Sequence, residues 1–276
     1  MTAHGWALVL GPGGPVGTAW LLGLAAGLRE AGVDPAGADV VAGTSAGAIA
    51  GAAILAGRDL AELAELPPRG GPRPPADLSV MARAFEIGAD PGLSPDEVRR
   101  RIGRLALEAA ALPEERHRAS MRFLVGTDAW PTGRLLITGV DVAAGEPVVW
   151  DAASGVPLSA AVAASSAAPG FAEPVTIGGR RYMDGAFGGR SAPELAEGAG
   201  TVVVVEPLAH MSDGAGVDVR IVPDERALEA FGGNVGDMSR WTPVYREGHR
   251  QAPAAARLLT AALPSTISPP RSGRVS

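Results

Sequence analysis

Apolar runs and helical patterns alternate in the first part of the chain. Trp6 to Leu10 is a short apolar run that stops at a glycine- and proline-rich turn, and a helical apolar pattern follows as far as Leu28. Asp39 to Ala42 is a second short apolar run, and the alanine-rich stretch from Ala46 to Ala56 is predicted to be helical. Two strand–helix units in succession predict a parallel sheet.

The alternation continues to the end of the chain. Thr201 to Val205 is a continuous β-branched run, which is typical of a central strand buried on both faces. Val175 to Met183 is predicted to be a hairpin. Further strands are predicted at Met121–Gly126, Leu135–Thr138, Pro147–Trp150 and Val219–Val222, and further helices at Ser94–Leu112, Pro157–Ala167, Asp224–Gly232 and Asp237–Leu263. The whole pattern predicts a three-layer α/β/α sandwich with a mostly parallel central sheet.

The chain is expected to form one domain over residues 1–263. Its 276 residues are 46% hydrophobic, which is enough for a sizeable core, and 38 Gly and 24 Pro predict many tight turns. The stretch from Pro67 to Pro75 holds five prolines and two glycines, so a loop is expected there, leading into a helical cap at about 67–118. The tail, residues 264–276, is rich in Ser, Pro and Arg and is expected to be disordered.

Charge and residue usage exclude several functions. The net charge is -6 and no long basic tract is present, so nucleic acid is not an expected partner. The lack of cysteine excludes disulfides, thiolate metal sites and cysteine nucleophiles, and no metal or organic cofactor is expected. The N-terminus does not resemble a secretory signal. The most apolar tract, Val40 to Gly57, is dominated by Ala and Gly and contains Thr44 and Ser45, so it is not expected to span a membrane. A cytoplasmic protein is expected, with any membrane contact peripheral.

The helix predicted from Ser94 carries a run of arginines. Ser94 is a suitable N-cap, Pro95 fits the first helical position, and two acids follow in the first turn. The arginines are Arg99, Arg100, Arg101 and Arg104. They could meet lipid head groups, but a charge run on a helix is usually its solvated face, and that interpretation is favoured.

The strongest chemical signal is Gly43-Thr44-Ser45-Ala46-Gly47, a GxSxG sequence between a predicted strand and a predicted helix. The two outer glycines relieve crowding at a strained turn, which exposes the Ser45 hydroxyl at the N-terminus of the following helix. The helix dipole and free N–H groups there favour developing negative charge. An ordinary Gly/Ser turn is the alternative, but the flanking elements favour Ser45 as a nucleophile.

The loop from Gly11 to Gly17 supplies glycine amides at the end of the neighbouring strand, where they can hold an oxyanion. A dinucleotide-binding turn is the competing interpretation. The GxGxxG spacing fails at Val16, however, and the second strand ends at Ser45 rather than at a ribose-binding acid. The loop therefore favours a hydrolase.

A serine nucleophile needs a base, and the chain has His4, His117, His210 and His249. His210 follows a predicted strand and is the better candidate for a Ser-His-Asp esterase, whereas His249 lies in a polar stretch typical of a solvated helix face. The α/β-hydrolases normally place several strands before the nucleophile, but only one strand–helix unit precedes Ser45.

The order of three motifs resembles the patatin-like phospholipases. The motifs are the glycine loop after the first strand, the GxSxG turn one strand–helix unit later, and Asp184-Gly185-Ala186 after a hairpin. Ala164 to Gly170 is also similar to the segment that precedes the hairpin in this family. The resemblance extends over about residues 5 to 235. It implies a lipid acyl hydrolase in which Ser45 and Asp184 form a catalytic dyad without histidine.

Asp184 makes chemical sense as the base in such a dyad. Gly185 lets the chain turn tightly at a strand end, which aims the carboxylate toward Ser45. Partial burial would raise its pKa above the ordinary value of about 3.9 and make it a better proton acceptor. Taken alone, an Asp-Gly pair is more often a simple hairpin turn.

The sequence departs from the family pattern in its glycine loop. Pro12 and Pro15 interrupt the glycines, and Val16 occupies a position that is usually Arg or Lys. Because proline has no N–H, the expected oxyanion donors are the amides of Gly13, Gly14 and Ala46. The asparagine usual after the Asp-Gly motif is also absent. A catalytically impaired patatin-like protein that binds or regulates lipids is therefore the second alternative.

Overall fold

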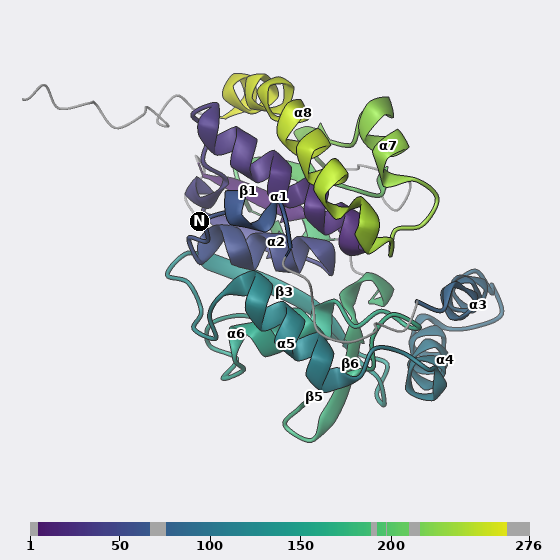
Figure 1. Ribbon diagram of the computed structural model, residues 1–276. Coiled ribbons are helices and arrows are strands. Elements are labelled where there is room, and N and C mark those ends of the chain that lie inside the picture. The colour runs from purple at the N-terminus through teal and green to yellow at the C-terminus, as the bar shows by residue number, and fades with distance from the viewer. Residues whose placement is uncertain (1–4, 67–75, 189–191, 197, 210–215, 264–276) are drawn as a thin grey trace, which may run out of the picture.

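A single mixed sheet lies at the centre of the computed structural model, which describes residues 5–66, 76–188, 192–196, 198–209 and 216–263 (Figure 1). The sheet order is β5-β6-β3-β2-β1-β7-β8, with β4 paired to β3. Strands β1, β2, β3, β7 and β8 pair in parallel, β4 and β6 pair antiparallel with β3, and β5 pairs antiparallel with β6. The strands are β1 (Trp6–Leu10), β2 (Val40–Gly43), β3 (Arg134–Asp141), β4 (Pro147–Trp150), β5 (Val175–Ile177), β6 (Arg180–Asp184), β7 (Thr201–Val205) and β8 (Val219–Ile221).

Helices cover both faces of this sheet. They are α1 (Gly14–Glu30), α2 (Ala46–Leu55), α3 (Leu78–Gly88), α4 (Pro95–Glu108), α5 (Glu114–Val125), α6 (Leu158–Ser165), α7 (Glu225–Phe231) and α8 (Trp241–Ala262), with the 3-10 helix η4 (Ala192–Ala196). On one face, α1, α2 and α6 pack on the strands, α5 packs on α2 and α6, and α8 packs on α1. Helix η4 covers the centre of the other face, and α4 with α3 covers its β3–β6 end. The predicted three-layer α/β/α sandwich with a mostly parallel sheet is confirmed.

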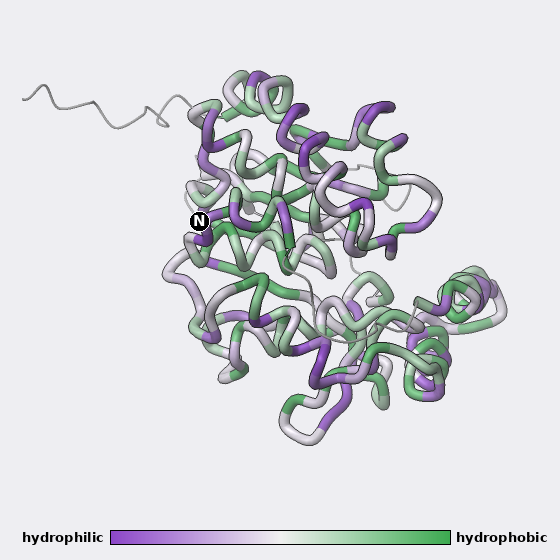
Figure 2. Tube along the Cα trace, viewed as in Figure 1, coloured by the Kyte–Doolittle hydropathy of each residue, from purple (hydrophilic) through white to green (hydrophobic). Residues whose placement is uncertain are grey.

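Strand side chains alternate between the two faces. Leu8 and Leu10 of β1 belong to the large core under α1 and α2, whereas Ala7 and Val9 belong to the smaller core on the opposite face. Figure 2 shows the central strands as mainly hydrophobic, with hydrophilic segments gathered on outer helices such as α7 and α8. Burial on both faces explains why these strands read as continuous apolar runs.

Two helices far apart in the sequence meet where α8 packs along α1 (Figure 1). A Cβ at Gly23 would lie 2.0 Å from the Tyr245 carbonyl oxygen, and one at Gly248 would lie 2.2 Å from the Trp20 carbonyl oxygen. Only glycine permits such a close approach of two helix backbones. This contact fixes the C-terminal part of the chain against the helix that begins in the glycine loop.

The predicted strand at Met121–Gly126 is wrong, because these residues form the end of α5 and its αL cap. His117, Met121 and Leu124 form one buried face of this helix, which ends at Gly126 with φ 83°. A short apolar run cannot be told from a buried helix segment by periodicity alone. The charged residues that precede it, from Glu114 onward, complete the amphipathic pattern of α5.

The expected cap region contains two helices that pack on each other, α3 and α4, and the start of α5. The proline-rich stretch 67–75 and the tail 264–276 lie outside the described residues. Within the described ranges, no helix combines the length and the apolar character needed to cross a membrane.

Candidate active site

Ser45 lies at a strained turn between β2 and α2. Its backbone has φ 54° and ψ -113°, and it is the only non-glycine residue with positive φ in the described part of the chain. A Cβ at Gly47 would lie 1.9 Å from the Leu10 carbonyl oxygen, and one at Gly43 would lie 2.6 Å from the Gly47 carbonyl oxygen. Both glycines are therefore required by close backbone approach, and the strain is stored at a serine whose hydroxyl faces a pocket.

Asp184 ends β6 and meets Ser45 directly. The Ser45 hydroxyl donates to Asp184 Oδ2 at 2.7 Å, and Asp184 Oδ1 accepts the Ala186 N–H at 2.8 Å. A Cβ at Gly185 would lie 2.2 Å from Thr138 Oγ1, so a tight turn against β3 needs glycine here. The two functional groups are 139 positions apart in the sequence and are brought together by the pairing of β6 with β3.

Burial sets the acidity of this carboxyl group. Asp184 is only 2% exposed, and desolvation raises the pKa of its carboxyl from 3.8 to about 7, although hydrogen bonds from Ala186 and Ser45 oppose the rise. A neutral carboxyl and a carboxylate are therefore both accessible near neutral pH. Such a group can accept a proton and return it within one reaction cycle.

Ser165 and Thr138, which were not singled out from the sequence, support the turn at Ser45. Ser165, at the end of α6 and fully buried, accepts the Ser45 backbone N–H at 3.0 Å. Thr44 and Thr138 share a hydroxyl hydrogen bond of 2.8 Å. Ser165 belongs to the segment Ala164–Gly170, which resembles the family pattern, but nothing local in that segment shows what the serine binds.

The glycine loop runs along the same pocket. Gly13, Gly14 and Ala46 line it beside Ser45. Gly14 and Ala46 are the first residues of α1 and α2, so their N–H groups have no partner within their own helices. The Gly11 N–H, by contrast, is bonded to the Val205 carbonyl oxygen at 3.0 Å.

Residues from the C-terminal part of the chain brace this loop. A Cβ at Gly13 or Gly17 would lie 2.6 or 2.9 Å from Pro207 Cβ, and the Val16 N–H donates to the Val235 carbonyl oxygen at 3.2 Å. The Val16 side chain is fully buried. Where the family usually has a cation, this chain therefore anchors the loop by packing and one backbone hydrogen bond.

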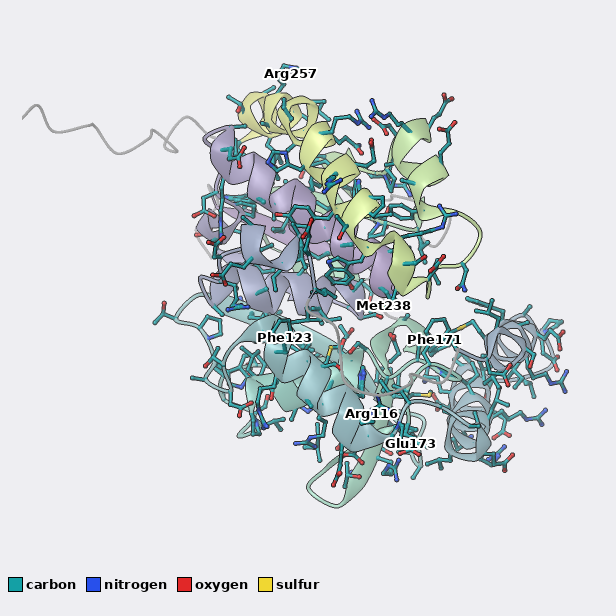
Figure 3. All side chains as sticks on the ribbon, in the orientation of Figure 1. Arg116, Phe123, Phe171, Glu173, Met238 and Arg257 are labelled. Carbon is teal, nitrogen blue, oxygen red and sulfur yellow. The ribbon has the colours of Figure 1, made fainter. Side chains whose placement is uncertain are left out.

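The pocket has a volume of about 250 Å³, and most of its lining is apolar. Its large side chains come from several elements and include Ile49, Phe85, Met121, Phe171, Met238 and Trp241. Figure 3 shows Phe171 and Met238 on the side of the molecule between the start of α8 and α3. A mainly apolar pocket that Ser45 and Asp184 also line suits a hydrocarbon chain next to a polar reacting group.

The histidines lie in different places. His117 lines the pocket from α5, with Nε2 at 2.9 Å from the Ala163 carbonyl oxygen and 3.2 Å from Ser166 Oγ. His249 pairs with Glu30 on the outside of α8. His4 and His210 lie outside the described residues. In the same described ranges, no cluster of three or more His, Asp or Glu side chains could hold a metal ion.

Comparisons with known proteins complete the description of the site. A family model described as patatin-like phospholipase matches residues 8–196. No curated protein matches the chain. One similar solved structure is the type III effector protein ExoU, at 19% identity and a TM-score of 0.43, which covers 91% of this chain and 52% of the effector. Another is VipD from Legionella pneumophila, at 16% identity and a TM-score of 0.38, covering 75% of this chain and 50% of VipD. The chain thus spans about half the length of each.

Proposed function

The chain belongs to the patatin-like phospholipase family, and from this premise we propose that it hydrolyses lipid acyl esters with Ser45 as nucleophile and Asp184 as general base. The observation that carries this proposal is the 2.7 Å hydrogen bond from the Ser45 hydroxyl to Asp184 Oδ2. No side chain stands between the two groups, so the proton has a direct path from the nucleophile to the base.

In the first half-reaction, the Asp184 carboxylate takes the hydroxyl proton as Ser45 Oγ attacks the ester carbonyl carbon. The resulting oxyanion is held by the N–H groups of Gly13, Gly14 and Ala46 at the starts of two helices. When the tetrahedral intermediate collapses, the alcohol leaves with the proton from Asp184. In the second half, Asp184 takes a proton from water, the hydroxide attacks the acyl-enzyme, and Ser45 regains its proton.

The apolar pocket supports a lipid rather than a polar ester as the substrate. Ile49 and Met121 line it beside Ser45 and provide a place for an acyl chain. The reaction needs no cofactor, because the base and the oxyanion donors belong to the chain itself. Peripheral contact with a lipid surface fits this substrate class.

The two alternatives make different demands on the same site. A Ser-His-Asp esterase requires an imidazole between serine and carboxylate, and the direct Ser45–Asp184 bond fills that place. A binding protein without turnover requires that the altered glycine loop fail to hold an oxyanion. The bracing of this loop by Pro207 and Val235 favours the active form.

The test uses a fluorophosphonate, which reacts with activated serines. We expect labelling of Ser45, with labelling and ester hydrolysis both lost in Ser45→Ala. Ser166→Ala, which alters another serine lining the same pocket, should remain labelled. His210→Ala should change the rate by less than about tenfold, because no imidazole takes part in the dyad.

Three results would contradict the proposal. They are labelling at a serine other than Ser45, loss of activity in His210→Ala with most activity retained in Asp184→Asn, and a wild-type protein that neither reacts with the probe nor hydrolyses any ester. The second favours the histidine triad, and the third favours the binding protein.

A further inference from the structure

A second cavity lies between α4 and the start of β6, and half of its described lining residues are arginines. Arg100 and Arg104 come from α4, and Arg180 and Arg181 come from β6. The other described lining residues are apolar or glycine, and none is acidic. The cavity has a volume of about 300 Å³ and shares none of these residues with the pocket beside Ser45.

Within the described residues, the ion pairs of the four arginines that line the cavity involve two carboxylates, Glu97 and Asp141. Glu97 is shared by three guanidinium groups, those of Arg100, Arg101 and Arg104, at 3.2, 3.0 and 3.2 Å. Their hydrogen bonds lower the pKa of Glu97 to about 2, so it stays ionised, yet it carries only one charge. The whole chain has a net charge of -6, so this positive region does not follow from the overall composition.

Hydrogen bonds and packing orient several of these arginines and leave some of their guanidinium N–H groups available to a ligand. Arg181 donates through Nε and Nη2 to the Pro174 carbonyl oxygen at 3.0 and 2.6 Å, and Arg180 Nε pairs with Asp141 at 2.6 Å. The side chain of Arg100 packs beside Gly145. Each guanidinium has five N–H groups, and within the described residues these bonds use only one or two of them.

The arginine run of α4 therefore has three different environments. Arg99 is buried and donates to the carbonyl oxygens of Gly145 and Gly188, so for this residue the solvated-face interpretation is wrong. Arg101 pairs with Glu97 on the outside of the helix. Arg100 and Arg104 are 37% and 57% exposed and face the cavity, where solvent and a ligand can reach them.

We propose that this cavity binds a phosphate group, carried by the head group of an anionic lipid or by a soluble phosphoester. Guanidinium groups match the oxygens of phosphate with paired N–H donors, and several of them together favour an anion of more than one charge. The volume lies at the lower end of ligand sites, which suits a head group rather than a whole lipid. This binding goes beyond ester hydrolysis, because the cavity contains no group of the Ser45 site.

The experiment uses the full chain carrying Ser45→Ala, so that vesicles are not hydrolysed. Its first arm is sedimentation with phosphatidylcholine vesicles, with and without phosphatidic acid. Its second arm is thermal unfolding with inorganic phosphate or inositol trisphosphate, against chloride at equal ionic strength. The test variant is Arg100→Gln with Arg104→Gln. The matched control is Arg101→Gln with Arg226→Gln, which removes the same charge from exposed arginines that do not line the cavity.

We expect the test variant to bind its ligand at least about tenfold more weakly than the protein with all four arginines, and the control to bind within about threefold. Binding to phosphatidic acid vesicles alone identifies a lipid head group, and stabilisation by soluble phosphates alone identifies a phosphoester. Binding in neither arm overturns the proposal. Equal losses in the test and control variants also overturn it, because they indicate diffuse charge attraction rather than a site.

The same variants separate this site from the proposed hydrolysis. With Ser45 restored, Arg100→Gln with Arg104→Gln should keep the wild-type rate on a short soluble ester, because neither arginine lines the pocket beside Ser45. If the protein proves to have no hydrolase activity, the binding experiment is unaffected, since it is performed without the Ser45 hydroxyl.

Discussion

Replacing Asp184 with Asn should make the protein more stable at alkaline pH while it removes activity. Burial raises the pKa of this carboxyl from 3.8 to about 7, so the folded protein holds a proton that the unfolded chain releases. The contribution of such a group to the free energy of unfolding is fully present below pH 3.8, where folded and unfolded chains both hold the proton. It is lost as the pH rises through about 7. At pH 8 the wild type must keep a buried carboxylate, and the amide of the variant has no charge to bury.

The size of the effect follows from the shift in pKa. A difference of about 3 units, at about 1.36 kcal/mol each, corresponds to about 4 kcal/mol as an upper limit. Asn can still accept the Ala186 N–H through its oxygen, and its amide can donate to Ser45 Oγ. We therefore expect the free energy of unfolding of Asp184→Asn to exceed that of the wild type by about 1 to 4 kcal/mol at pH 8. Near pH 4 the two free energies should be almost equal.

Urea unfolding of wild type and variant between pH 4 and 8 measures this difference. Asp141→Asn is the matched control, because Asp141 is also 2% exposed but pairs with Arg180 and accepts the N–H groups of Ala143 and Ala144. This control should be destabilised instead. On a soluble ester, Asp184→Asn should lose at least about a hundredfold in kcat/KM, because an amide cannot accept the serine proton.

The reasoning would be refuted if Asp184→Asn were less stable than wild type at pH 8, or if the difference in stability did not change with pH. Either result would mean that the carboxyl is solvated, or is charged and well compensated, in the folded protein. Retention of most activity by a folded Asp184→Asn would separately refute the role of Asp184 as the base.

The remaining predictions concern the same site. The kcat/KM of the wild type should rise with pH to a plateau with a midpoint near 7, because Asp184 must be ionised to accept the proton; a flat profile from about pH 5 to 8 would argue against this base. Ser165→Ala removes the acceptor of the Ser45 N–H and should lower kcat about tenfold with little change in KM. Ser165→Thr, which keeps a hydroxyl, should retain part of the lost kcat, and Ser166→Ala should change kcat little. Gly47→Ala places a Cβ 1.9 Å from the Leu10 carbonyl oxygen and should lower the free energy of unfolding, measured by thermal unfolding, by about 3 kcal/mol or more. Gly88→Ala should leave this free energy nearly unchanged, because a Cβ at Gly88 meets open space.

Local sequence determined the elements that surround Ser45. The strands predicted at Trp6–Leu10 and Asp39–Ala42 are β1 and β2 of the structure, the second shifted by one residue to Val40–Gly43. They and the helices that follow them were predicted from apolar runs and glycine turns, because each is set by residues close together in the chain. The order of the motifs predicted the family, and the family model agrees over residues 8–196. The error at Met121–Gly126 has the same origin, since an apolar run of that length fits a strand and a buried helix equally well.

Only the tertiary structure decided how the site is held together. The Ser165 hydroxyl accepts the Ser45 N–H, and Pro207 and Val235 pack against the glycine loop. These contacts join segments far apart in the chain, so they could not be predicted from any local sequence pattern. The raised pKa of Asp184 likewise depends on how much water the packed core excludes. A sequence fixes backbone preference and residue chemistry within a few positions, whereas burial and hydrogen-bond partners arise when distant segments pack against one another.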